Sequence, residues 1–459
     1  MIARDAARVW HPYTQMLTRP DPLAIVRGEG IYLYTADGRR LLDGFSSWWV
    51  NIHGHAHPRL NEALAAQAGQ LEHVVFANCT HAPAVELAER LVALLPAGLT
   101  RVFYSDNGST AVEVAMKIAL QFWGNQGQPR RTFITLEHAY HGDTVGAMSA
   151  SEDSIFTRPF ASMLFDVVRA PSPYAYRCTL GGLAEAGRHQ DAGRHEQTAR
   201  HDPNACAAHC LDAMDALLAR HRGQVAAVLV EPMLQGAGGM IMWPADYLAG
   251  LRRLCDAHGT LLISDEVLTG FGRTGRLFAC EHAGISPDII CLSKALTGGY
   301  MPLGATVVSD RVYEAFLSPD RTRTFFHGHS FTANPLACAV ALASLDLIES
   351  SDAVAKVQQI ERWLRDGLEP LRDLPLAGDI RVLGDVGVVE LVSDKQSKEA
   401  GGYLDEIGPR LTRAFLERGL LLRPLGNVVY VMPPYVITQA QTAWMLQQVR
   451  EVLGAIIES

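Results

Sequence analysis

The middle of the chain alternates short apolar runs with helical patterns. Five runs share one form, a continuous apolar stretch that ends in a polar or charged residue: RVFYSD (101–106), RTFITLE (131–137), VAAVLVEP (225–232), TLLISDEV (260–267) and DIICLSK (288–294). Such runs are typical of parallel strands buried on both faces. Residues 109–123 follow the first run and place apolar side chains three or four positions apart, which predicts a helix with one apolar face. The alternation predicts an α/β protein, whose ligands bind at the carboxyl ends of the strands.

The two ends of the chain have a different pattern. Residues 25–45 predict a small hairpin with its turn at Asp37-Gly38. From about residue 352, helical patterns alternate with the strand-like pieces VGVVELV and NVVYVMPP, which predicts a second, α+β domain. Neither end is large enough to form a core alone, so we expect the N-terminal segment to pack against the C-terminal domain. The expected division is residues 61–335 for a large domain, and residues 1–60 with 336–459 for a smaller one.

Residues 178–210 interrupt the large domain. They hold Gly, His, Ala and charged residues with little apolar periodicity, which predicts a surface insertion or mobile loop. The segment contains several histidines and cysteines: Cys178, His189, His195, His201, Cys206, His209 and Cys210. A zinc site is conceivable there, but neither a CxxC nor a paired ligand spacing occurs, so we expect a solvated loop and no metal.

Composition and charge narrow the functional classes. The 459 residues are 48% hydrophobic and 19% charged, as in a globular protein with a large core. A formal net charge of -9 argues against general nucleic-acid binding. No apolar run approaches the roughly 18 residues of a membrane span, and the N-terminus lacks the apolar core of a secretory signal. The eight cysteines show no disulfide-framework spacing, so we expect reduced thiols and a cytoplasmic location.

The strongest chemical signal lies in residues 263–299. Asp265 closes one predicted strand and Lys294 closes the next, so in adjacent parallel strands both side chains project at the same edge of the sheet. A partly desolvated lysine there can act as an amine nucleophile. An aspartate opposite it can hold the positive charge of a pyridinium nitrogen. For either residue alone, an ordinary strand-end charge is the simpler interpretation; together they predict a cofactor site.

Two further segments follow predicted strands. Gly108-Ser109-Thr110 lies just before an amphipathic helix, where free backbone N–H groups and the helix dipole favour a phosphate, although a simple N-cap has the same pattern. Tyr140 and His141 precede the tight turn at Gly142, and an aromatic ring there could stack on a flat cofactor. A structural role for His141 is as plausible as general base catalysis, so we assign it no catalytic role.

DEVLTGFGRTG, the lysine of CLSKALTGG, and VEPMLQGAGGM (230–240) resemble the class III aminotransferases, which are fold-type I enzymes dependent on pyridoxal phosphate. The resemblance implies a large domain with a mostly parallel seven-stranded sheet, and a smaller α+β domain. It also implies that Lys294 carries the cofactor as a Schiff base and that Asp265 pairs with its pyridine nitrogen. It further implies that Gly108 and Ser109 bind the phosphate and that Tyr140 stacks on the cofactor ring. Glu231 would be a supporting residue near the cofactor.

WHPYTQM (10–16), SSWW (46–49) and RPLGNVVYVMPPY (423–435) are similar to one branch of that family, the adenosylmethionine–8-amino-7-oxononanoate aminotransferases of biotin synthesis. This resemblance implies a ping-pong transfer of an amino group from S-adenosylmethionine to 8-amino-7-oxononanoate. It also implies a substrate pocket formed by Tyr13, Trp48, Tyr140, Gly328 and Arg423, with Arg423 on the substrate carboxylate. Trp48 and Trp49 are adjacent, and in a strand only one of them can face the pocket. Asp143 and Arg273 fall on matching positions, as pocket or supporting residues.

The branch also forms homodimers whose active sites are shared between subunits. This implies that Ser330 reaches the cofactor phosphate of the neighbouring subunit. The chain departs from the best-known members at Asn107, where they place a serine, and at HGHSF (327–331), where they have HGPTF. The HGHS form also occurs in relatives that use lysine, so lysine stays open as the amino donor. The alternatives are another class III transaminase that acts on ω-amino acids or diamines, a catalytically inactive relative, and a metal-binding interaction protein.

Overall fold

A seven-stranded sheet forms the centre of the molecule. The computed structural model describes residues 1–178, 180 and 202–457. The sheet has the order β4 (Leu99–Ser105), β12 (Gly304–Ser309), β11 (Ile289–Leu292), β10 (Leu261–Asp265), β7 (Val225–Val230), β5 (Thr132–Leu136) and β6 (Val168–Ala170). β12 is antiparallel to both of its neighbours, and the pairs from β11 to β6 are parallel. The predicted mostly parallel sheet is confirmed; β6 and β12 are the strands that the apolar runs did not reveal.

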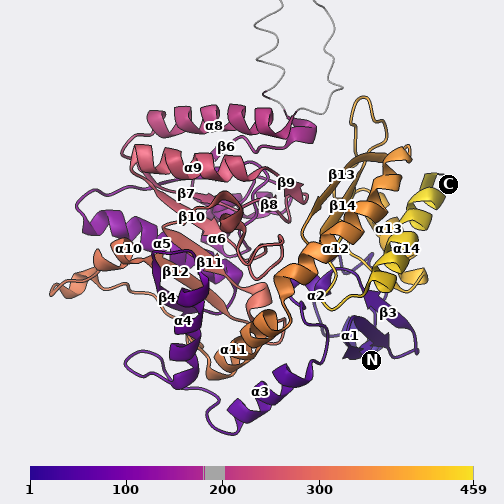
Figure 1. The fold of residues 1–459 in the computed structure, drawn as a ribbon, viewed down its shortest axis with the longest axis horizontal. Helices are drawn as coiled ribbons and strands as arrows, with labels where there is room; N and C mark the ends of the chain where they lie inside the picture. Colours follow the sequence, from indigo (N-terminus) through magenta and orange to yellow (C-terminus); the bar gives the residue numbers. More distant parts are fainter. Residues whose placement is uncertain (179, 181–201, 458–459) are drawn as a thin grey trace, which may run out of the picture.

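Helices cover both faces of this sheet. Alternate strand residues face opposite sides, so Leu229 and Ile263 pack under α5 (Gly108–Asn125), while Val228 and Leu262 face the opposite layer. That opposite layer consists of α4 (Ala82–Leu94), α8 (Pro203–Arg220), α9 (Ala245–His258) and α11 (Pro335–Ser350). Figure 1 shows α8 and α9 side by side over β7 and β10. α3 (Pro58–Ala68) packs on α11, and α6 (Val145–Ala150) packs on α5. The helix predicted over residues 109–123 is therefore α5.

A smaller sheet follows along the chain. It has the order β13 (Ala377–Leu383), β14 (Val386–Leu391) and β16 (Val428–Val431), all antiparallel. Three helices share its apolar core: α12 (Ala353–Leu368), α13 (Ile407–Glu417) and α14 (Gln439–Ile457). The two strand-like pieces predicted in this region are β14 and β16.

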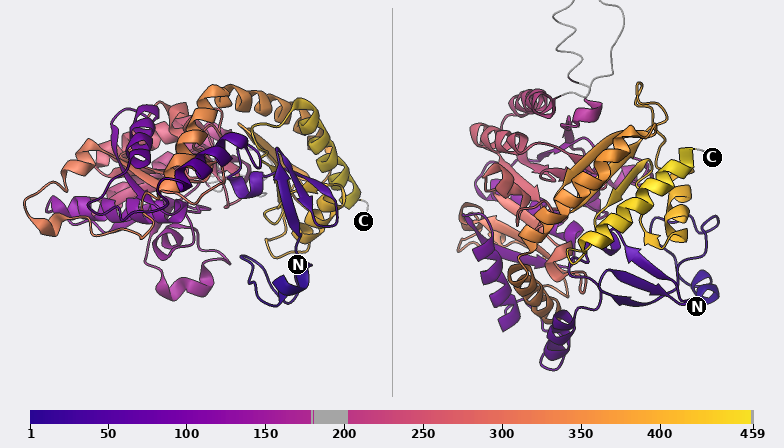
Figure 2. Two further views of the ribbon diagram at one scale, coloured as in Figure 1. Left: turned by 90° about the horizontal axis from the view of Figure 1, so that it is seen from below. Right: turned by 45° about the vertical axis from the view of Figure 1, so that its right-hand side comes forward.

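The N-terminal strands join this C-terminal part of the chain. β1 (Ile25–Glu29), β2 (Tyr32–Thr35), β3 (Arg40–Asp43) and β15 (Leu420–Leu421) form one sheet, in which β15 is parallel to β3. The predicted hairpin is β2 and β3, and Gly38 of its turn has a φ of +88°, which glycine adopts at little cost. Figures 1 and 2 show the two termini on the same side of the molecule.

The remaining elements are short. They are α1 (Ile2–Ala6), α2 (Ser46–Trp49), α10 (Asp310–Glu314), β8 (Leu234–Gln235), β9 (Ile241–Met242), and the 3-10 helices η1 (Arg158–Met163), η2 (Ala175–Arg177), η3 (Ala279–Ala283), η4 (Lys294–Thr297), η5 (Arg321–Arg323) and η6 (Glu369–Asp373).

The loop predicted over residues 178–210 is wrong at its end. α8 begins at Pro203, and Asp202 caps it by accepting hydrogen bonds from the backbone N–H groups of Asn204 and Ala205. Cys206 and Cys210 lie one turn apart on the buried face of α8. That apolar face is narrow, which is why periodicity did not reveal the helix. Residues 181–201, with His189, His195 and His201, lie outside the described part of the chain.

Two properties of the described residues bear on the predicted class. None of their helices is both long and apolar enough to cross a membrane. No three of their histidine, cysteine, aspartate or glutamate side chains are grouped so that they could hold a metal ion.

Candidate active site

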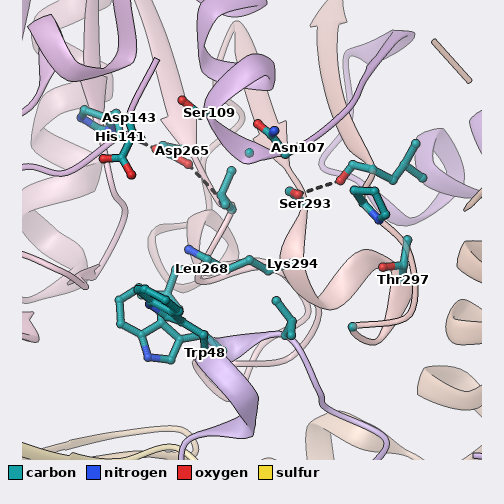
Figure 3. A pocket seen from close by; sticks show the side chains of 18 of the residues that line it. Trp48, Asn107, Ser109, His141, Asp143, Asp265, Leu268, Ser293, Lys294 and Thr297 are labelled. Atoms are coloured by element: carbon teal, nitrogen blue, oxygen red, sulfur yellow. Dashed lines mark hydrogen bonds and ion pairs between the residues drawn. The ribbon is translucent and has the colours of Figure 1, made fainter. Parts of the chain in front are cut away.

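A cavity of about 690 Å³ opens at the carboxyl ends of the central strands. Asp265 is the last residue of β10, and Lys294 stands two residues beyond the end of the neighbouring parallel strand β11. Both line the cavity, and in Figure 3 the Lys294 side chain extends between Asp265 and Trp48. Parallel pairing of β10 with β11 therefore brings the two residues to one edge of the sheet, as their strand-end positions predict.

The Lys294 amine belongs to a half-buried side chain that lines the cavity. It lies 4.8 Å from the centre of the Trp49 ring. Burial lowers its pKa from 10.5 to about 8, although the carboxylates of Asp265 and Glu231 oppose the shift. A large share of the amine is therefore neutral near pH 8, which is the form that attacks a carbonyl or accepts a proton.

Asp265 is held by two donors. Its Oδ2 lies 2.7 Å from Nδ1 of His141, which is buried beside it, and its Oδ1 accepts a hydrogen bond of 3.1 Å from the backbone N–H of Val267. These contacts fix the plane of the carboxylate toward the cavity. His141 has no catalytic role predicted from the sequence, and this pairing gives it a supporting one. The signal available in the sequence was its place after a strand of the same sheet.

Glu231 follows β7 and is fully buried. Its two oxygens accept hydrogen bonds of 2.9 Å from the backbone N–H groups of Tyr140 and Gly236. Burial raises the pKa of this carboxyl to about 7, although the two hydrogen bonds from the backbone act to lower it. The carboxylate therefore fixes the backbone of the loop that carries Tyr140, whose ring lines the cavity.

The predicted phosphate turn forms the first turn of α5. Asn107 is the N-cap: its side chain accepts from the backbone N–H of Thr110, and the Thr110 hydroxyl accepts from the backbone of Asn107. Ser109 Oγ lies 2.7 Å from Thr144 Oγ1 and accepts from its backbone N–H. Asn107 thus serves as the cap, and the hydroxyl of Ser109 remains beside the cavity.

Two glycines let backbone segments meet at this turn. A Cβ atom on Gly108 would lie 2.5 Å from Val267 Cγ1. Gly142 has a φ of +127°, and a Cβ atom there would lie 2.3 Å from Ser109 Oγ. Side chains at either position would close the cradle between β10 and the first turn of α5. An open cradle at a helix N-terminus fits the phosphate of the predicted cofactor.

The expectation that only one of Trp48 and Trp49 faces the pocket is wrong, because the segment is not a strand. Ser46, Ser47, Trp48 and Trp49 all have positive φ, between 44° and 73°, and form a left-handed turn. Such backbone costs about 1 kcal/mol or more per non-glycine residue, so its surroundings must hold it. The backbone N–H of Ser47 donates to the Asp43 carboxylate at 3.0 Å, and the Ser47 hydroxyl donates to it at 2.7 Å. Trp49 Nε1 donates to the Tyr430 hydroxyl at 3.0 Å.

This turn places both tryptophans at the cavity. Trp49 is 3% exposed and lies beneath the Lys294 amine, while Trp48 is 36% exposed. The alternation of a strand would have turned one of them away. Trp49 is therefore a site residue that the sequence analysis did not identify.

A second cavity, of about 920 Å³, adjoins the first through Tyr13, Trp48, Tyr140 and Asp143. The Arg423 guanidinium lines it and lies 4.4 Å from the centre of the Trp48 ring. The Tyr13 hydroxyl donates to Asp143 Oδ2 at 2.5 Å. The structure thus brings three predicted substrate-pocket residues, Tyr13, Trp48 and Arg423, around one space next to Lys294.

Three predicted residues lie apart from these cavities. Arg273 is fully buried, pairs with Asp385 and donates to the Trp49 carbonyl at 2.8 Å, so it supports the left-handed turn without lining the site. Gly328 and Ser330 are exposed and line neither cavity of their own chain. Their predicted contact is with a second subunit.

Known proteins are similar to this chain over nearly all of its length. The family model described as aminotransferase class-III matches residues 14–453. The adenosylmethionine-8-amino-7-oxononanoate aminotransferase of Synechococcus elongatus is 48% identical over 98% of this chain and 99% of its own length. The crystal structure of the enzyme of that name from Methanocaldococcus jannaschii superposes with a TM-score of 0.89 at 35% identity, covering 99% and 98% of the two chains. The structure of a PLP-bound amine transaminase from an uncultivated Pseudomonas species superposes with a TM-score of 0.91 at 33% identity, covering 98% of each of the two chains.

Proposed function

The chain belongs to the class III aminotransferases, which are pyridoxal-phosphate enzymes, and we propose that it transfers an amino group to 8-amino-7-oxononanoate to form 7,8-diaminononanoate. The observation that carries this proposal is the placement of Arg423. Its guanidinium stands in the cavity that adjoins Lys294. A ketone with a distant carboxylate can then be bound at both ends.

The residues around the first cavity fit pyridoxal phosphate. The glycine cradle at Gly108 and Gly142 leaves room for the phosphate at the N-terminus of α5, with the Ser109 hydroxyl beside it. Asp265 would hold the pyridine nitrogen, and Lys294 would bind the cofactor covalently. The ring of Tyr140 would pack on the cofactor, with Glu231 holding its loop.

The bound cofactor supplies an electron sink for negative charge that develops on the substrate carbon. The chain supplies the remaining steps. The neutral amine of Lys294 would take the proton from the amino-bearing carbon of the donor. Asp265, positioned by His141, would hold the ring nitrogen through its carboxylate. Trp49 covers the lysine and keeps water from the reacting atoms.

Substrate recognition falls to the second cavity. A guanidinium can bind the carboxylate of 8-amino-7-oxononanoate through two parallel hydrogen bonds. Stacking on Trp48 keeps Arg423 in place while leaving its N–H groups available. Tyr13, bonded to Asp143, lines the path between Arg423 and Lys294. S-adenosylmethionine is the proposed amino donor, and the two substrates use the site in turn, in a ping-pong sequence.

We further propose a homodimer. Phe326 and Phe331 flank Gly328 and Ser330 and are 75% and 61% exposed, while Leu17 near the N-terminus is 90% exposed. Large exposed apolar side chains of this kind are typical of a subunit interface. In the dimer, Ser330 would donate its hydroxyl to the cofactor phosphate of the partner. Buried thiols such as Cys255 and Cys280 favour a reducing compartment, so we place the enzyme in the cytoplasm.

A direct assay tests the reaction. The purified protein is loaded with pyridoxal phosphate and incubated with 8-amino-7-oxononanoate and adenosylmethionine, and 7,8-diaminononanoate is measured by mass spectrometry. The proposal predicts product from the wild type and none from Lys294→Ala. Amination of pyruvate or 2-oxoglutarate with no product from 8-amino-7-oxononanoate would instead identify a transaminase of ω-amino acids or diamines.

A further inference from the structure

The carboxylate of Asp43 lies at the end of β3 and has no exposed surface. Each of its oxygens has two donors nearby. Oδ1 accepts from the backbone N–H groups of Ser47 at 3.0 Å and Phe45 at 3.4 Å. Oδ2 accepts from the Ser47 hydroxyl at 2.7 Å and lies 3.0 Å from His55 Nε2. A carboxylate has about four lone-pair sites, so this one is fully used, and three of its donors belong to the segment that forms the left-handed turn.

His55 supplies the fourth donor from outside the turn, and its side chain is 12% exposed. A carboxylate only accepts, so Nε2 carries the proton, and Nδ1 of the neutral ring accepts from the Asn51 amide at 2.9 Å. The backbone of His55 is held as well, because its N–H donates to the Gly30 carbonyl at 2.7 Å and its carbonyl accepts from the Gly30 N–H at 3.2 Å. The imidazole is therefore fixed in one orientation toward Asp43.

The left-handed turn carries two rings that touch functional groups of the site. The centre of the Trp49 ring lies 4.8 Å from the Lys294 amine, and the centre of the Trp48 ring lies 4.4 Å from the Arg423 guanidinium. The backbone of the turn has positive φ at non-glycine residues, so it keeps this shape only while its contacts hold it. A loosened turn would therefore be felt at both Lys294 and Arg423.

Two sets of contacts hold the turn at different points. Tyr430 and Arg273 hold it at Trp49, through the indole N–H and the backbone carbonyl. Asp43 holds it at Ser47, through the backbone N–H and the hydroxyl. The second set depends on a carboxylate whose own position is fixed by a donor from elsewhere in the chain.

We propose that His55 is a positioning residue of the active site: it donates to Asp43, and through Asp43 it holds the tryptophan turn (Ser46–Trp49) against Lys294 and Arg423. His55 lines neither of the two cavities, so it acts only through these partners. The inference goes beyond the proposed function and rests on it in one respect, the roles of Lys294 and Arg423.

The test compares two neutral variants of His55 in the holoenzyme. Glutamine has an amide N–H group at about the position of imidazole Nε2, whereas asparagine is too short to reach Asp43 and replaces only Nδ1. His55→Gln should therefore keep the wild-type kinetics. His55→Asn should lower kcat by about 10-fold and raise the KM for 8-amino-7-oxononanoate by about 3-fold, because Lys294 and Arg423 both lose a neighbour that holds them in place.

The second readout is the pH titration of the visible cofactor band. Its midpoint should move by about half a pH unit or more in His55→Asn, because water reaches Lys294 once Trp49 no longer covers it. His258→Asn is the matched control. His258 also pairs with an aspartate, Asp215, at 2.6 Å, and lines neither cavity. It should leave the kinetics and the titration unchanged.

Two outcomes would contradict the positioning role. One is a His55→Asn enzyme with wild-type kinetics and an unmoved band. The other is a His55→Gln enzyme impaired as much as His55→Asn, since the Nε2 donor would then be irrelevant. Should His55→Asn not fold, Ser47→Ala decides, because it removes the 2.7 Å bond to Asp43 from the side of the turn. It should move the band midpoint in the same sense, and an unmoved midpoint would contradict the role.

Failure of this inference can be told apart from failure of the proposed function. A wild type that forms no visible band with pyridoxal phosphate would overturn both, since Lys294 would not carry the cofactor. A wild type that forms the band and aminates 8-amino-7-oxononanoate, with His55→Asn indistinguishable from it, would overturn the positioning role alone.

Discussion

The imidazole of His141 and the carboxylate of Asp265 are buried together, with Nδ1 2.7 Å from Oδ2. His141 lies in the loop after β5 and Asp265 ends β10, and both strands are neighbours of β7 in the central sheet. The pair matters because the cofactor is useful as an electron sink only while its ring nitrogen stays protonated. In the proposed site His141 would act on that nitrogen through Asp265, as a positioning residue.

His141→Asn should therefore impair catalysis without impairing substrate binding. We expect kcat to fall by about 10- to 100-fold, as is typical when a buried partner of a functional group is lost. The KM for 8-amino-7-oxononanoate should stay within about 2-fold, since His141 lies away from Arg423. The pH dependence of the visible cofactor band should shift, which a merely structural change would not produce. His282→Asn, a half-buried histidine bonded to Thr274, is the control and should leave that profile unchanged.

The lowered pKa of Lys294 predicts a pH-dependent stability of the cofactor-free protein. The amine has a pKa of about 8 in the folded chain and 10.5 ordinarily, so the unfolded chain binds more protons between these values. Stability therefore rises with pH from about 8 to about 10.5, and below pH 8 the buried amine costs stability. Lys294→Met should stabilise the cofactor-free protein by about 3 kcal/mol at pH 7, at about 1.4 kcal/mol per pKa unit.

Urea unfolding at pH 7 and pH 10 measures this difference. The advantage of Lys294→Met should shrink at pH 10, where the folded wild-type chain has already lost the proton and the unfolded chain is losing it. An advantage that is equal at the two pH values would contradict the buried, weakly basic lysine.

Arg423 should act on one substrate only. Arg423→Ala removes the charge that faces the carboxylate, so we expect the KM for 8-amino-7-oxononanoate to rise by about 10- to 100-fold. The donor half-reaction should change less, because Arg423 is assigned to the carboxylate of the ketone. Steady-state kinetics with each substrate varied in turn measures both effects. Arg158→Ala is the matched control: Arg158 lines the same cavity, exposed at its edge near Asp153, and should affect neither substrate. Equal effects of Arg423→Ala on both substrates would refute the clamp.

If Ser330 reaches the cofactor phosphate of the partner subunit, two defective variants should complement each other in a mixed dimer. In mixed dimers of Lys294→Ala with Ser330→Ala, the subunit that keeps Lys294 receives an intact Ser330 from its partner. One complete site is formed, so cofactor affinity and activity should recover to about half of the wild-type value. No recovery, in dimers purified through two different tags, would mean that Ser330 acts within its own chain or not at all.

The sequence identified those parts of the site that depend on strand order. Lys294 and Asp265 could be predicted because apolar runs mark strands and charged residues mark their ends. Ser109 could be predicted in the same way, since a helix follows a strand there. Pairing of β10 with β11 then brought these residues together.

Other parts depend on conformation that no periodicity records. The left-handed turn at Trp48-Trp49 is held by Asp43, Tyr430 and Arg273, which are far apart in the sequence. Nothing in the local pattern distinguishes this turn from a strand end. The rings of Phe156 and Tyr403 meet through tertiary packing across nearly 250 positions, and β12 carries too short an apolar run to stand out. Helix α8 was missed because only a narrow stripe of it is apolar.

The central claim is that Lys294, with the cofactor it carries, aminates the ketone held by Arg423. One measurement tests it most directly. The enzyme is first converted to its amino form, the free donor is removed, and 8-amino-7-oxononanoate is added alone. The account predicts one 7,8-diaminononanoate per active site and full return of the visible cofactor band, with neither in Lys294→Ala. An unchanged spectrum with 8-amino-7-oxononanoate, followed by return of the band on adding pyruvate, would contradict it.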